Sequence, residues 1–226
     1  AILLMKGLKR INHKYSPESG HTISADAGAS LSAVVSLALA QEISGMEFCA
    51  GIPGSVGGAV RMNAGAYGKE IKDVVGNVYL IDAQGEKKEM CREEITFEYR
   101  KTELPSGAII LGASFKLEKG NREEIKKRIM EIMKWRQEKH PLEYPNAGSI
   151  FKNIPGKPAG RIIEEMGMKG QGIGDAQISP KHANFIVNTG KATASDVLQL
   201  ISLVQKKARE EKGIKLETEV VIIGDE

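Results

Sequence analysis

The sequence predicts an α+β fold with two domains. Helical and strand-like segments alternate along the 226 residues, but the short extended segments of the first half lack the repeated crossovers of a parallel sheet. The composition changes at "PLEYPNAGS", residues 141–149, so we place a domain boundary between residues 141 and 142 and a C-terminal strand at 218–226. At 41% hydrophobic and 27% charged residues, the chain is long enough to bury a sizeable core.

Turn and capping residues delimit the individual elements. We expect a turn over "NHKYSPESG", 12–20, because it is rich in Asn, Ser, Pro and Gly. The strand-like segments are 1–5, 21–28, 73–82, 85–90, 107–120, 184–190 and a closing strand over 215–224. The expected helices are 30–45, 121–139, a short one over 159–167, and 193–213.

The helix over 121–139 has the clearest signals. Asn121 followed by Glu124 resembles a capping box, and the Pro141 that follows His140 ends the helix. A single buried face is expected from the spacing of its apolar residues, with Trp135 as a core or edge anchor. These residues are Ile125, Ile129, Ile132, Met133 and Trp135.

Charge and cysteine usage exclude several classes of function. Lys and Arg mostly alternate with Glu and the net charge is only +3, so no basic stripe for nucleic acid is present. No apolar run is long enough to cross a membrane. The two distant cysteines and four scattered histidines indicate neither a disulfide framework nor a metal site, and we expect reduced thiols in the cytoplasm. The start at Ala1, directly into a strand-like run, indicates a chain that lacks its N-terminal portion.

The stretch "GIPGSVGGAVRMNAGAYG", Gly51–Gly68, has six glycines in eighteen positions, against roughly one in fourteen for an average domain. It matches neither a Walker loop nor G-x-G-x-x-G. Successive bare N–H groups beside the Ser55 hydroxyl could form an anion-binding concavity for a pyrophosphate or the edge of a flat ring. The alternative is a tight structural connection that uses glycine only for sharp bends.

Three further stretches carry candidate catalytic groups. Arg100, beside Tyr99 in "FEYRKTE", offers a planar fork for a carboxylate or a developing enolate, although a lone arginine is usually solvated. Ser149 in "NAGSIFKN" is either a capping hydroxyl or a proton donor. No histidine lies near it in sequence to activate it as a nucleophile. Glu217 and Glu219 in "LETEV" would share one face of a strand, as a solvated pair or with one carboxyl protonated in a pocket.

Taken in order, "GIPGSVGGAVRMNAGAYG", "YR", "NAGSIFKN", "HANFIVN" and "LETEV" resemble the UDP-N-acetylenolpyruvoylglucosamine reductases, flavoenzymes of peptidoglycan synthesis. The resemblance covers essentially the whole chain and is closer to the shorter form of the family. It implies an FAD-binding domain of the vanillyl-alcohol-oxidase type, here its C-terminal portion over 1–141, and a smaller α+β substrate domain over 142–217. It also implies NADPH as electron donor and a small-molecule UDP-sugar enolpyruvyl ether as substrate.

The resemblance assigns roles to particular residues. Arg100 would stabilise the enolate left by hydride transfer, Ser149 would protonate C2, and Glu219 would be the active-site glutamate, protonated or polarising a neighbouring donor. The implied FAD contacts are Gly54, Ser55, Gly57, Gly58, Asn63 and Gly65. The weaker candidates for holding the UDP-sugar are Lys152, Asn153 and Asn184.

Two substitutions depart from the family pattern. Thr102 replaces a commoner serine, and Asp175 replaces a usual glycine, where its charge could weaken UDP-sugar binding. The family also continues upstream into a loop that contacts the FAD pyrophosphate. Two alternatives therefore stay open: a flavin-free nucleotide-sugar-binding remnant, or another flavin oxidoreductase of the same fold.

Overall fold

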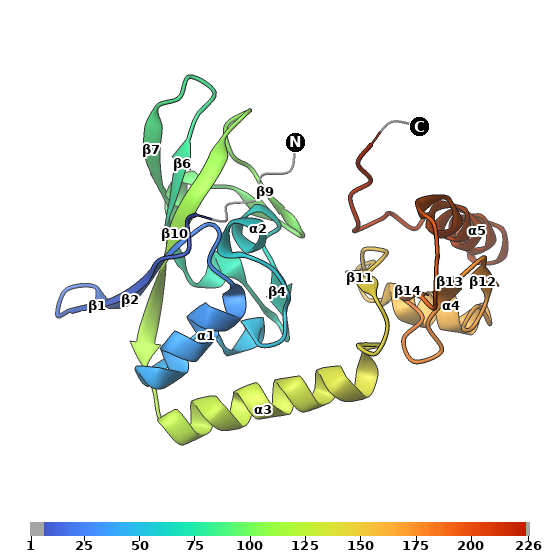
Figure 1. Ribbon diagram of the computed structural model, residues 1–226, viewed down its shortest axis with the longest axis horizontal. Coiled ribbons are helices and arrows are strands. Elements are labelled where there is room, and N and C mark those ends of the chain that lie inside the picture. The colour runs from blue at the N-terminus through green and yellow to red at the C-terminus, as the bar shows by residue number, and fades with distance from the viewer. Residues whose placement is uncertain (1–6, 225–226) are drawn as a thin grey trace. The chain divides into compact units, whose positions relative to one another are not determined.

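The computed structural model describes residues 7–224. The chain folds as two compact units, the first comprising Ala1–Lys134 and the second Trp135–Glu226. Each unit has its own sheet, helices and apolar core, which Figure 1 shows in blue to green and in yellow to red. The expected strand over 1–5 lies outside the described residues.

The first unit is built on an antiparallel sheet with the strand order β1-β2-β10-β6-β7. The long central strand β10 also pairs near its end with the short β3. The bounds of these strands are β1 Ile11–Ser16, β2 Gly20–Asp26, β3 Ile43–Ser44, β6 Val75–Ile81, β7 Lys87–Cys91 and β10 Ile109–Lys119. In Figure 1 the β1–β2 hairpin projects from the rest of this unit.

Helices and two small hairpins complete the first unit. Helix α1 (Leu31–Ala40) begins at Ser30, whose hydroxyl accepts the Ala33 N–H, and it contacts β2. Helix α2 (Val56–Arg61) lies within the glycine stretch and contacts β2 and β10. The hairpins pair β4 (Gly65–Ala66) with β5 (Lys69–Glu70), and β8 (Phe97–Glu98) with β9 (Lys101–Thr102). Short 3-10 helices cover Glu47–Cys49, Ile71–Asp73 and Arg92–Glu94.

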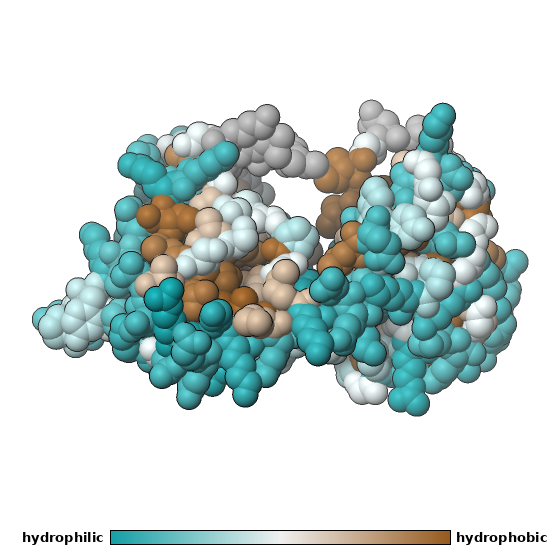
Figure 2. Space-filling view, turned by 60° about the horizontal axis from the view of Figure 1, so that its bottom comes forward, coloured by the Kyte–Doolittle hydropathy of each residue, from teal (hydrophilic) through white to brown (hydrophobic). Residues whose placement is uncertain are grey.

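Helix α3 (Arg122–Lys139) runs from the first unit into the second. Asn121 Oδ1 accepts the N–H groups of Glu123 and Glu124, so this residue caps the helix as expected. The single buried face is only partly correct, because Met133 and Trp135 are 45% and 43% exposed. Charged side chains cover most of this helix, and its surface is largely hydrophilic in Figure 2.

The second unit combines a small antiparallel sheet with two helices. Its strands follow the order β11-β14-β13-β12. The bounds are β11 Asn146–Ser149, β12 Gly172–Ile173, β13 Ala176–Ile178, β14 Phe185–Asn188, α4 Ala159–Glu165 and α5 Ala194–Lys212. Helix α5 begins with a capping box between Thr193 and Asp196 and ends at Gly213, which has φ +65°.

Two of the expected elements are wrong. Residues 12–16, expected as part of a turn, belong to β1. Pairing with β2 forms this strand, although its Asn and Ser residues favour a turn. The closing strand over 215–224 is reduced to one isolated bridge, Phe151 with Thr218, and Val221, Ile222 and Ile223 have no regular secondary structure and are exposed. A run of β-branched residues has high strand propensity but becomes a strand only with a partner.

Candidate active site

Intrachain hydrogen bonds hold the start of the glycine stretch. The N–H groups of Val56 and Gly57 donate to the carbonyls of Ala29 and Ala27, both at 2.9 Å. The Ser55 hydroxyl accepts the Gly58 N–H at 3.3 Å and caps α2. The predicted anion concavity is therefore wrong for these three amides, because each already donates within the chain.

The glycines of this stretch have different reasons to lack a side chain. A Cβ at Gly65 would lie 2.6 Å from the Lys69 carbonyl oxygen, and one at Gly57 would lie 3.0 Å from the Ala27 Cβ, so both are needed for internal packing. A Cβ at Gly58 would meet only the Ser55 hydroxyl, at an ordinary 3.6 Å. Gly54, with φ +131°, has nothing within 4 Å of that position. Gly54 and Gly58 thus leave bare surface that internal packing does not require.

Asn63 connects the glycine stretch to its surroundings from a fully buried position with φ +40°. Its Nδ2 donates to Glu70 Oε2 at 3.0 Å and to the Glu98 carbonyl at 3.1 Å. Its Oδ1 accepts the Lys72 N–H at 3.0 Å. The Asn63 side chain therefore fixes the chain around the β4–β5 hairpin.

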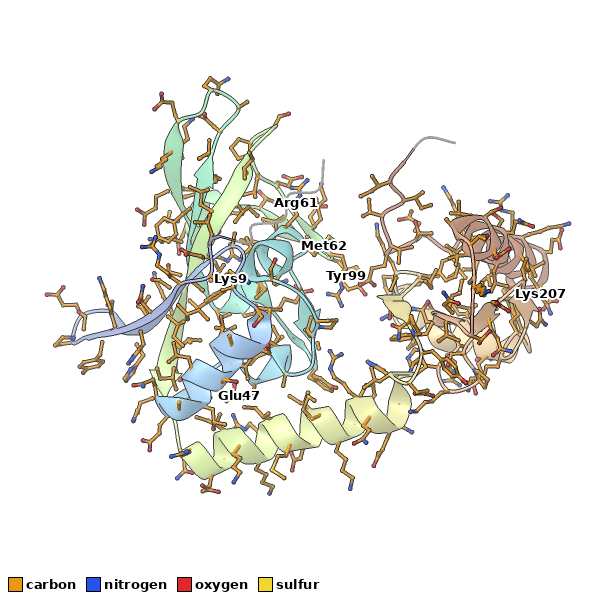
Figure 3. The ribbon with its side chains drawn as sticks, viewed as in Figure 1. Lys9, Glu47, Arg61, Met62, Tyr99 and Lys207 are labelled. Atoms are coloured by element: carbon orange, nitrogen blue, oxygen red, sulfur yellow. The ribbon has the colours of Figure 1, made fainter. Side chains whose placement is uncertain are left out.

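Arg100 lies in the turn between β8 and β9 with φ +59°, a left-handed conformation that is uncommon for a bulky residue. Its Nη2 donates to the Gly65 carbonyl at 3.1 Å, and its guanidinium lies 4.6 Å from the centre of the Tyr99 ring. The departure at Thr102 is accommodated, because its hydroxyl donates to the Val60 carbonyl and its carbonyl accepts from Arg61 Nη1. Figure 3 shows Arg61, Met62 and Tyr99 along one edge of the first unit.

Two of the three predicted catalytic residues come together in the second unit. Ser149 ends β11 and pairs with Phe185 on β14. The residues that follow Ser149 bond to the "LETEV" segment. The Glu219 N–H donates to the Ile150 carbonyl at 2.7 Å, and the Lys152 N–H donates to the Glu217 carbonyl at 2.9 Å. The "LETEV" segment thus runs beside the residues that follow Ser149, and Glu219 is partly buried there.

The three predicted sugar-binding residues have intrachain partners. Asn184 is 3% exposed, and its side chain bonds both backbone groups of Phe151, at 3.0 and 2.8 Å. Asn153 Oδ1 accepts the Ala159 N–H at the start of α4, and Lys152 forms a 3.4 Å ion pair with Glu217. Asn184 therefore holds the Ser149 segment against β14, whereas the Lys152 side chain is 40% exposed and Asn153 is an exposed residue.

Comparisons with known proteins agree across the chain. The family model described as the C-terminal domain of UDP-N-acetylenolpyruvoylglucosamine reductase matches residues 140–223, and one described as an FAD binding domain matches residues 2–90. A protein of Syntrophus aciditrophicus with that reductase name is 46% identical over 225 residues, which are 100% of this chain and 72% of the relative. The chain belongs to the UDP-N-acetylenolpyruvoylglucosamine reductase family.

Further similarities place this reductase chain in the same fold. A relative from Caldanaerobacter subterraneus subsp. tengcongensis is 49% identical over 91% of this chain and 68% of its own length. The crystal structure of the reductase from Thermus caldophilus superposes with a TM-score of 0.79 at 42% identity, covering 87% of this chain and 70% of that one. The predicted family and the α+β class with an FAD-binding domain are confirmed.

The surface of this reductase chain fits an FAD. A flat ring needs backbone that it can approach closely, and the uncovered positions at Gly54 and Gly58 supply it. Among residues 7–224, no helix is long and apolar enough to cross a bilayer.

Sequence reasoning overlooked one residue that contacts two of the candidate site residues. Glu70 bonds Asn63 and lies 3.6 Å from the Arg100 guanidinium, but nothing in the local sequence distinguishes it from the other glutamates. The one available signal was its place directly after the glycine stretch, two residues from Gly68.

Proposed function

We propose that this chain carries out the reduction of the enolpyruvyl group of UDP-N-acetylglucosamine enolpyruvate to UDP-N-acetylmuramate, in bacterial peptidoglycan synthesis. The observation that carries this proposal is the family match across both parts of the chain, first an FAD-binding domain and then the reductase C-terminal domain. Residues 1–141 would form the flavin-binding part and 142–217 the substrate-binding part, with the segment over 218–226 contributing Glu219.

When FAD is bound and has been reduced by NADPH, it would supply the hydride that C3 of the substrate receives. The chain's own residues handle the charge and the proton. Arg100 holds the substrate carboxylate and stabilises the negative charge that develops on it, because a planar guanidinium can donate two parallel hydrogen bonds. The backbone of Gly54, Ser55, Gly57 and Gly58 would hold the flavin, and Asn63 and Gly65 would support it through the hairpin that they shape.

Ser149 donates its hydroxyl proton to C2 of the substrate. The hydrogen bond from Glu219 N–H to the Ile150 carbonyl places the glutamate beside this serine's segment, where its carboxyl can polarise the hydroxyl. Lys152 reaches the UDP-sugar with its exposed ammonium group, while Asn153 and Asn184 act through the backbone that they hold. Reduced thiols and a nucleotide-sugar substrate favour a cytoplasmic enzyme that binds no nucleic acid and no membrane.

The test separates the two half-reactions in the full-length enzyme by stopped-flow absorbance of the flavin. Ser149→Ala is expected to leave flavin reduction by NADPH unchanged and to slow reoxidation by the enolpyruvyl substrate roughly 10²- to 10⁴-fold. Ser202→Ala, an exposed serine on α5, is the matched control and should change neither rate. Unchanged reoxidation in Ser149→Ala would refute the proton-donor role.

The unmodified enzyme tests the reaction itself. If it holds flavin but is not reoxidised by this substrate, the proposed reaction is refuted and another flavin oxidoreductase is favoured. If it holds no flavin, a nucleotide-sugar-binding remnant is favoured.

A further inference from the structure

Four polar side chains of the first unit form a connected group that we name the Glu70 cluster: Asn63, Glu70, Lys72 and Arg100. Glu70 is its centre and is 18% exposed. One carboxylate oxygen, Oε2, accepts from Asn63 Nδ2 at 3.0 Å and pairs with Lys72 Nζ at 2.8 Å. The other, Oε1, lies 3.6 Å from Arg100 Nη1, which is ion-pair distance without a direct hydrogen bond.

The backbone beneath Glu70 is fixed from several directions. Glu70 ends the β4–β5 hairpin, and its own N–H donates to Asp73 Oδ2 at 2.8 Å. Asn63 Oδ1 accepts the Lys72 N–H. The asparagine that donates to the Glu70 carboxylate therefore also holds the backbone two residues after it. At Gly65 an added Cβ would lie 2.7 Å from Glu70 Cγ, so the glycine makes room for this side chain.

The same hairpin contacts the Arg100 guanidinium. The Gly65 carbonyl accepts from Nη2 at 3.1 Å while Glu70 faces Nη1, and Tyr99 lies against the guanidinium. These three contacts restrain a side chain that is 19% exposed and whose backbone has a strained φ of +59°. The Gly65 carbonyl and the Glu70 carboxylate thus bring two contacts from the β4–β5 hairpin to the guanidinium, and both restrain its direction.

The two cations of the Glu70 cluster lie at different distances from its carboxylate. Lys72 is closer to the Glu70 carboxylate than Arg100 is, at 2.8 Å against 3.6 Å. The hydrogen bond to Glu70 is also the main cause that raises the pKa of Lys72, which keeps this lysine charged. With two cations and one carboxylate, the cluster keeps a net positive charge. Lys72 therefore compensates Glu70, so that the carboxylate can orient Arg100 without cancelling its charge.

We propose that Glu70 is a positioning residue for Arg100: it fixes the guanidinium through the β4–β5 hairpin and acts on the reaction through that arginine. This inference rests on the proposed function of Arg100. Misplacing a catalytic group by about 1 Å can cost on the order of 10²-fold in rate. Glu70 itself needs no contact with the substrate.

The test uses Glu70→Gln in the full-length enzyme, because glutamine keeps the shape and the acceptor for Asn63 but loses the charge. We expect the same flavin content, the same rate of flavin reduction by NADPH, and reoxidation by the enolpyruvyl substrate slowed by roughly 10- to 100-fold. Glu103→Gln is the matched control, since this exposed glutamate pairs only with Lys101 among the ion pairs described and should leave both rates unchanged.

A double-mutant cycle with Arg100→Lys distinguishes positioning from a general structural role. If Glu70 acts through Arg100, adding Glu70→Gln to Arg100→Lys slows reoxidation by less than about threefold more. Multiplied rate losses in the double variant, or equal losses in both half-reactions, would overturn the proposal.

Lys72→Met is the second variant, because a 38% exposed lysine can be lost without unfolding. It leaves Glu70 uncompensated beside Arg100 and should also slow reoxidation selectively. An unmodified enzyme that is not reoxidised at all would contradict the proposed function itself, which is a separate outcome. Normal reoxidation in both Glu70→Gln and Lys72→Met contradicts only the positioning role.

Discussion

Asp175 shows how a single charge is used within the second unit. Its Oδ2 accepts the Lys191 N–H at 2.6 Å, and its carbonyl accepts from the Thr189 N–H and hydroxyl at 2.9 and 3.0 Å. A Cβ at Gly190 would lie 2.7 Å from the same carboxylate oxygen, so the glycine admits it. The side chain closes the 188–191 turn that precedes α5, which is a structural reason for the aspartate at this position.

Asp175→Ala should therefore destabilise the protein without improving substrate binding. We expect the free energy of unfolding to fall by about 1 kcal/mol, the usual worth of one hydrogen bond at a partly exposed site. The KM for the UDP-sugar should stay within about twofold, since the carboxylate is engaged by backbone N–H. Urea unfolding and steady-state kinetics measure the two quantities. A severalfold lower KM in the variant would show instead that the charge opposes the substrate.

At the scale of elements, the glycine stretch contains two kinds of glycine that mutagenesis can separate. Gly65→Ala forces a Cβ to 2.6 Å from the Lys69 carbonyl, so it should lower the free energy of unfolding by about 1–3 kcal/mol. Gly58→Ala adds a methyl group to a helical position with ordinary contacts, and alanine there should stabilise α2 by up to about 1 kcal/mol.

The two variants should also differ in flavin binding. Because Gly58 has no internal need for a bare backbone, its alanine variant should keep or raise the melting temperature of the flavin-free protein while it weakens FAD binding. Flavin fluorescence titration beside a thermal melt measures both. Unweakened FAD binding in Gly58→Ala would mean that this position is remote from the cofactor.

The starts of three helices were predicted well from sequence because capping signals are local. Ser30, Asn121 and Thr193 all cap helices in the structure, within a residue of the expected starts, whereas α1 ends at Ala40 instead of 45 and the short α2 was not expected. Strands depend on partners elsewhere in the chain, which is why β1 was missed and the closing strand was expected.

For the candidate site, motifs selected Arg100, Ser149 and Glu219, whose roles stay predictions. The hydrogen bond that brings Glu219 beside Ile150 spans 69 residues of sequence, so no local pattern could predict it. The approach of Glu70 to Arg100 spans 30, and no periodicity or cap reports such a contact.

At the scale of the molecule, the separate cores of the two units predict separate responses to acid. His140 belongs to the second unit, where it packs 4.9 Å from Phe185 and 5.6 Å from His182, measured between ring centres. Burial, reinforced by Arg136, His182 and Lys181, lowers the pKa of His140 to about 4. Burial is also the main cause that lowers the pKa of His182.

Both histidines are thus neutral in the folded unit but bind protons near pH 6.5 once unfolded. The unfolded state then holds more protons below pH 6.5, so the stability is full above that value and is lost as the pH falls from about 6.5 to about 4. Trp135, the one tryptophan of the chain, lies 5.4 Å from the His140 ring, so its fluorescence reports this cluster.

We expect the tryptophan-detected melting temperature of the flavin-free protein to fall between about pH 7 and about pH 4.5. His140→Phe keeps a ring against Phe185 but cannot take up a proton, so its melting temperature should fall less over the same range. Calorimetry should show two transitions, with the one that coincides with the tryptophan signal moving further with pH. A His140→Phe variant as acid-sensitive as the unmodified protein would assign the effect to other groups, first to His182, which packs in the same ring cluster and whose pKa burial also lowers.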